Sequence, residues 1–126
     1  MKHLFNALLL VGALAGTQAY AACDYPIAPG KFPDGLQATK DEMVTAKHAV
    51  EKYNTDIDAY LTCIQTEFDA KLAEQKDLKA DKKAELQRVQ DQKHNAAVEE
   101  VTAVAARFNE QLRAWKAKNM PEKKPS

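Results

Sequence analysis

The chain has 126 residues, and its 18 Lys and Arg residues equal its 18 Asp and Glu residues in number, so the formal net charge at pH 7 is 0. Beyond residue 22, 17 basic residues face 18 acidic ones, which leaves a net charge of −1. A balanced surface of this kind gives no electrostatic case for nucleic-acid binding or for broad attraction to a membrane.

Residues 1–22 have the pattern of a cleaved secretory signal peptide. Lys2 provides the positive start, an apolar core runs as far as Leu14, and Ala19 and Ala21 are small residues at the positions that a signal peptidase reads. The apolar core is too short to remain as a membrane-spanning helix. We therefore expect an exported, periplasmic protein with no stable membrane span after cleavage, and about 105 remaining residues suffice for one small domain.

Cys23 follows the signal directly, and Cys63 is the only other cysteine in the chain. One hypothesis is a Cys23–Cys63 disulfide, and the alternative is an inner-membrane lipoprotein acylated at Cys23. Tyr20 stands where lipoprotein signals usually have an aliphatic residue, and acylation would leave Cys63 as a lone thiol in an oxidising compartment. Both points favour the disulfide. A disulfide between two chains, and hence a homodimer, stays open as an alternative.

Residues 23–38 form a segment rich in Pro and Gly that we call the arm. Thr39 begins a predicted helix, so Cys63 lies about 36 Å along that helix. The 16 residues from Cys23 to Thr39 span at most about 55 Å, so the arm reaches Cys63 only if it is nearly extended. Its prolines favour such a conformation, and closing the loop stabilises the fold by about 4 kcal/mol. These prolines are Pro26, Pro29 and Pro33.

No Gly or Pro occurs between Leu36 and Met120, and Ala, Glu, Lys, Gln and Leu predominate there, which predicts long helices. Thr39 and Glu42 have the spacing of a capping box at the first helix start. The polar stretch around residues 74–81 predicts a break, where Asp77 or Asp81 would cap a second helix. Residues 119–126 are expected to form a flexible tail.

Apolar residues recur at three- and four-residue steps on both predicted helices. The first set is Met43, Ala46, Val50, Tyr53, Ile57, Tyr60, Leu61, Ile64, Phe68 and Leu72, and the second is Leu86, Val89, Ala97, Val101, Val104, Phe108, Leu112 and Trp115. A turn near residue 79 places the two sets opposite each other, with Val50 facing Phe108 and Leu61 facing Ala97.

The predicted fold is therefore all-α, a long antiparallel two-helix hairpin over residues 39–118. Its helices cover about residues 39–76 and about residues 80–118, and each is about 55 Å long. Because the turn contains neither Gly nor Pro, one unbroken helix of about 120 Å in a dimeric coiled coil stays open as an alternative.

The residue types used in catalysis and metal binding do not gather in this sequence. His48 and His94 would lie about 24 Å apart along the hairpin, too far to share an ion. Ser126 is the sole serine, and two oxidised cysteines leave no thiolate. We expect no enzyme activity, no metal and no cofactor.

Several short motifs cover nearly the whole mature chain. They are Cys23-x-Tyr25-Pro26, Pro33-Asp34-Gly35, Glu42-Met43, Val50-x-x-Tyr53, Tyr60-Leu61-x-Cys63, Asn95-Ala96-Ala97-Val98 and Arg107-Phe108-Asn109. In these motifs the chain resembles a group of small, uncharacterised exported proteins of Gram-negative bacteria. The resemblance implies a periplasmic location and a helical fold, and it implies no site residues.

The function hypotheses are non-enzymatic. The first is a structural or adaptor protein of the cell envelope, self-associating through a strip such as Ala49, Val98 and Ala105. The second is a periplasmic holdase-type chaperone. Met43, Phe108 and Trp115 form a candidate partner surface, although the same helical spacing is typical of a plain core.

Overall fold

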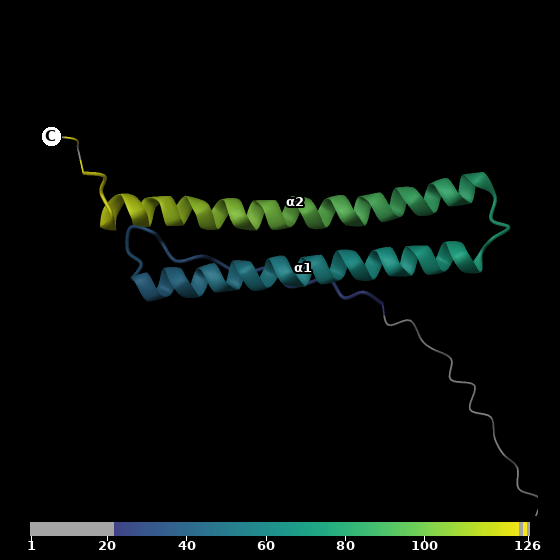
Figure 1. The fold of residues 1–126 in the computed structure, drawn as a ribbon, viewed down its shortest axis with the longest axis horizontal. Coiled ribbons are helices and arrows are strands. Elements are labelled where there is room, and N and C mark those ends of the chain that lie inside the picture. Colours follow the sequence, from purple (N-terminus) through teal and green to yellow (C-terminus); the bar gives the residue numbers. More distant parts are fainter. Residues whose placement is uncertain (1–21, 124, 126) are drawn as a thin grey trace, which may run out of the picture.

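The computed structural model describes residues 22–123 and 125, and this part of the chain contains two long helices. Helix α1 comprises Lys40–Glu74 and helix α2 comprises Ala80–Asn119. They lie side by side and antiparallel, joined by residues 75–79 at one end (Figure 1). The all-α hairpin is confirmed and the single rod is wrong. The predicted signal peptide, apart from Ala22, lies outside the described residues.

The capping box at the start of α1 is present as expected. The Thr39 hydroxyl accepts the Glu42 backbone N–H at 3.2 Å, and the Glu42 carboxylate accepts the Thr39 N–H at 2.7 Å. The hydrogen bond from the Thr39 backbone, followed by the one from its side chain, lowers the pKa of Glu42 from its ordinary value of 4.5. The box fixes where the arm ends and the helix begins.

Replacing the capping hydroxyl, Thr39→Ala, is expected to lower the free energy of unfolding by about 1 kcal/mol. Because the pKa of Glu42 is lower in the folded state than in the unfolded state, its contribution is present above about pH 4.5 and is lost as the pH falls through the folded value. Urea unfolding at neutral and at acidic pH measures both effects. Glu42→Gln must weaken this pH dependence, and an unchanged profile would contradict the assignment.

The connection between the helices differs from expectation in its cap. Lys79 is the N-cap of α2 and makes no side-chain capping hydrogen bond. The prediction that Asp77 or Asp81 caps this helix is therefore wrong. Asp81 lies instead in the first turn, where its negative charge still interacts favourably with the helix dipole.

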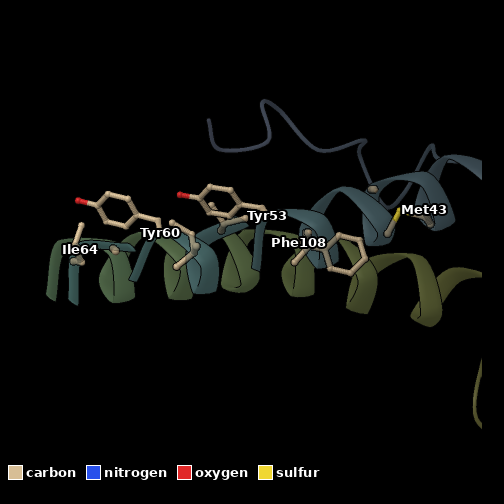
Figure 2. Close-up of a cluster of buried hydrophobic side chains, with 10 residues drawn as sticks. Met43, Tyr53, Tyr60, Ile64 and Phe108 are labelled. Atoms are coloured by element: carbon tan, nitrogen blue, oxygen red, sulfur yellow. The ribbon is translucent and has the colours of Figure 1, made fainter. Parts of the chain in front are cut away.

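The core lies along the seam between the two helices and occupies only part of its length. Figure 2 shows Ile64, Tyr60, Tyr53, Phe108 and Met43 in a row along the helix pair. The complete buried set is Met43, Ala46, Val50, Tyr53, Ile57, Tyr60, Ile64, Ala97, Val104 and Phe108. All of these lie in the half of the hairpin that includes the helix ends near the arm.

The register between the helices agrees with the predicted pairing to within one helical turn. The Gln90 side-chain amide donates to the Gln65 amide oxygen across the seam at 3.4 Å. The predicted pairing puts Lys93 opposite Gln65, three residues away. The apolar stripes therefore do face each other as the sequence indicates.

The arm forms a third layer on the hairpin. It runs back along the helices from the start of α1 (Figure 1), and Cys23, Ala28, Phe32 and Ala38 pack against the core. Within the described residues, neither helix has an apolar stretch long enough to cross a membrane.

Candidate functional site

The arm is fastened at its first residue by a disulfide. Cys23 and Cys63 are bonded, with their Cα atoms 5.8 Å apart, so the predicted intramolecular pairing is confirmed. The two sulfur atoms and the Glu67 carboxylate lie within 4.8 Å of one another. Sulfur in a disulfide is not a thiolate and does not bind a metal ion, so this cluster holds no metal while the bond is intact.

Aromatic side chains fix the middle of the arm against both helices. The Tyr25 ring meets Tyr60 of α1 edge-on at a centroid distance of 4.9 Å, and Phe32 meets Phe108 of α2 in the same way at 5.6 Å. Edge-to-face pairs at these distances stabilise beyond the burial of their area. The sequence predicts an arm that runs along the first helix, with Phe32 near Phe108 at the open end of the hairpin. The structure confirms the Phe32–Phe108 contact and places the arm over the seam between the two helices.

The last turn of the arm is held on α2 by close packing. The Gly35 N–H donates to the Gln111 side-chain oxygen at 2.9 Å, and the Trp115 indole N–H donates to the Ala38 carbonyl at 3.0 Å. A Cβ atom at Gly35 would lie 2.0 Å from the Gln111 backbone oxygen. Only glycine allows the two backbones to approach this closely.

Burial along the arm is partial and distinguishes the prolines from their exposed neighbours. The partly buried residues are Cys23, Pro26, Ala28, Pro29, Phe32 and Pro33, and the exposed residues between them include Asp24, Ile27 and Gly30. The prolines of the arm therefore face the hairpin, and Ile27, 94% exposed, faces away from it.

The rise along the arm indicates an extended chain. Tyr25 packs on Tyr60, and Phe32 lines a surface depression together with Ala46. The 14 residues of α1 between these two levels span about 21 Å. Seven arm residues cover the same distance, or about 3 Å each, close to the rise of polyproline II. The arm is thus extended along its middle.

A side-chain hydrogen bond joins the arm to α2. The Tyr25 hydroxyl donates to the Glu100 carboxylate at 2.7 Å, while the neighbouring Tyr53 hydroxyl is buried without a hydrogen-bond partner among the described residues. Burial and then the Glu100 hydrogen bond raise the pKa of Tyr25 above its ordinary value, and burial likewise raises the pKa of Tyr53. Both phenols therefore stay neutral at physiological pH.

Removal of each of these two hydroxyls is expected to have a different effect on the free energy of unfolding. Tyr53→Phe removes an unpaired buried group and should leave the free energy of unfolding unchanged or raise it by up to about 1 kcal/mol. Tyr25→Phe removes a hydrogen bond and should lower it by about 1 kcal/mol. Urea unfolding of the two variants tests both expectations. A larger loss of unfolding free energy for Tyr53→Phe than for Tyr25→Phe would contradict the hydrogen bonding described for these two hydroxyls.

The candidate partner surface of the sequence analysis lies beneath the arm. Met43 and Phe108 are buried and Trp115 is partly buried, so in this conformation they belong to the core that the same spacing also indicates. His48 and His94 are both exposed. We call the covered face of the hairpin, lined by Tyr53, Tyr60, Phe108 and Trp115, the arm groove.

Within residues 22–123, the half of the hairpin beyond the disulfide is not covered by the arm. We call residues 65–96 the distal half, and within this range Gln90 alone is buried. Phe68, Leu72 and Leu86 are partly buried there, and Val89 is 39% exposed. The apolar stripes continue through this half, but two helices alone cannot enclose them.

Sequence reasoning found the disulfide but missed Gly35, the Trp115–Ala38 contact and the Tyr25–Glu100 pair. The Pro33-Asp34-Gly35 run does signal a turn, but nothing in it indicates that Gly35 touches α2. Comparison of the chain with family models, with curated proteins and with solved structures finds no match.

Proposed function

We propose that this protein is a non-enzymatic structural or adaptor protein of the bacterial cell envelope, exported to the periplasm. The secretory pattern of residues 1–22 and the Cys23–Cys63 disulfide support the location, since disulfides persist in oxidising compartments. The disulfide also occupies the sulfur that acylation of Cys23 requires.

The observation that carries the adaptor function is the uncovered distal half. The arm ends at Cys23, level with Cys63. Beyond this point, none of the residues that the structure describes forms a third layer over the apolar seam with Phe68, Leu72 and Leu86. A contiguous, partly exposed apolar strip on a rigid pair of helices is typical of a protein-interaction surface. A helix of a partner protein laid along this strip would complete the core that the arm completes elsewhere.

Site-specific photo-crosslinking in the intact envelope tests this proposal. A photoreactive amino acid at Val89 is expected to capture a defined protein, identified by mass spectrometry. Ala103, exposed on the arm-covered half of the same helix, is the matched control and should capture none. Equal capture at both positions, or none at Val89, would contradict an adaptor surface on the distal half.

A holdase-type chaperone is the second candidate. It is favoured by separate exposed apolar side chains, Ile27 at 94%, Met120 at 64% and Leu36 at 56% exposure, which could contact an unfolded client. Suppression of aggregation of several unrelated denatured proteins by the purified mature chain would support this function. One specific partner without such suppression would support the adaptor.

A further inference from the structure

The arm groove recognises the arm through side chains. Among residues 23–33, no backbone group forms a hydrogen bond with the helices. Cys23, Ala28 and Phe32 pack against the core, Tyr25 packs on Tyr60, and Pro26 and Pro29 are partly buried. Proline-rich ligands in polyproline II conformation dock in aromatic-lined grooves in this manner. The arm is thus a bound proline-rich ligand that belongs to the same chain.

Two features define what the groove selects. The rings of Tyr25 and Phe32, seven positions apart, pack on Tyr60 and Phe108, so a ligand needs aromatic residues at this spacing. The Glu100 carboxylate accepts a hydrogen bond from the first ring, which favours tyrosine at that position. Prolines between the rings hold the ligand extended before it binds and so reduce the entropy lost on binding.

The disulfide determines whether the groove is free. With Cys23 bonded to Cys63 and residue 39 continuing into α1, the arm is covalently held at both ends and cannot leave. The two cysteines are only partly buried and line an open depression with Asp24 and Pro26, so a reductant has access. A dithiol would donate two electrons and two protons to give two thiols and would itself become a disulfide.

We propose that the arm groove binds a proline-rich extended segment of a partner protein, with aromatic residues seven positions apart, once a dithiol reduces Cys23–Cys63. The arm is then a strap that blocks this second binding surface in the oxidised protein. The inference rests on the proposed adaptor function and adds a redox-controlled ligand class to it.

Disulfide capture of a peptide tests the groove directly. The probe is a synthetic peptide of residues 22–33, whose cysteine can bond Cys63 of the full mature Cys23→Ala chain. In a thiol–disulfide buffer, this peptide is expected to be captured about tenfold more than one with alanine at both aromatic positions, because two ring contacts are lost. Equal capture of the two peptides would overturn the proposal.

Two further measurements complete the test. Wild-type protein kept reduced in dithiothreitol must bind fluorescently labelled, S-alkylated forms of the two peptides with the same preference, which covers the case in which Cys23→Ala does not fold. Oxidised wild-type protein without reductant must bind neither labelled peptide, and binding there would contradict the proposal that the arm blocks the groove. If the peptides fail while Val89 still crosslinks a partner, the adaptor function stands and this inference alone is wrong.

Discussion

Removal of the disulfide by Cys23→Ala together with Cys63→Ala is expected to lower the free energy of unfolding by about 4 kcal/mol. The bond closes a loop with a sequence separation of 40, and the unbonded unfolded chain regains the entropy of that loop. For a domain of this size, such a loss lowers the melting temperature by roughly 15 to 30 °C.

Thermal unfolding followed by helical circular dichroism measures this effect. Reduced wild-type protein is the matched control and should melt with the double variant, since both lack the same bond. The helices themselves should form in both proteins at low temperature, because their caps and seam remain. A melting temperature within a few degrees of the oxidised wild type would show that the arm contributes little to stability.

Gly35→Ala is expected to lower the free energy of unfolding by about 2 to 3 kcal/mol. The added Cβ would lie 2.0 Å from the backbone oxygen of Gln111 and 3.0 Å from the Cβ of Ala114, and neither helix atom can move aside cheaply. The turn must lift from α2, which also breaks the hydrogen bond from Trp115 to Ala38. Because Trp115 is the only tryptophan, its emission should shift to longer wavelength.

Gly30→Ala is the matched control for this variant. A Cβ at Gly30 meets nothing within 4 Å, and neither glycine has a positive φ. This substitution should therefore leave tryptophan emission unchanged and raise stability slightly, by about 0.4 to 1 kcal/mol, by restricting the unfolded chain. Similar losses for the two variants would mean that close packing at Gly35 is not what holds the arm.

Much of the architecture could be predicted because its causes are local. The absence of Gly and Pro between residues 36 and 120, the Thr39–Glu42 box and the two apolar stripes each act within a few turns of helix. The Cys23–Cys63 bond was also predictable, since chain reach and helix rise limit where an extended arm can go. The N-cap of α2 could not be predicted, because an Asp such as Asp81 is favourable both as an N-cap and in the first turn of a helix.

The position of the arm on the hairpin could not be predicted from local sequence patterns. Its prolines indicate an extended segment, but which side of the hairpin it occupies depends on Phe108, Gln111 and Trp115, all more than 70 residues away. The same holds for Met43 and Phe108, whose helical spacing suits a core and an exposed surface equally. Burial beneath the arm decides for the core.

The sequence by itself determined two helices, their antiparallel pairing and the cysteines that join the arm to them, because helix propensity, capping and chain reach are properties of short segments or of distances along the chain. Only the tertiary structure decided that the arm covers half of the seam, that its prolines are partly buried, and that residues 65–96 have no third layer among the part of the chain that the structure describes. These features depend on which distant side chains fill the seam together, and periodicity does not specify that.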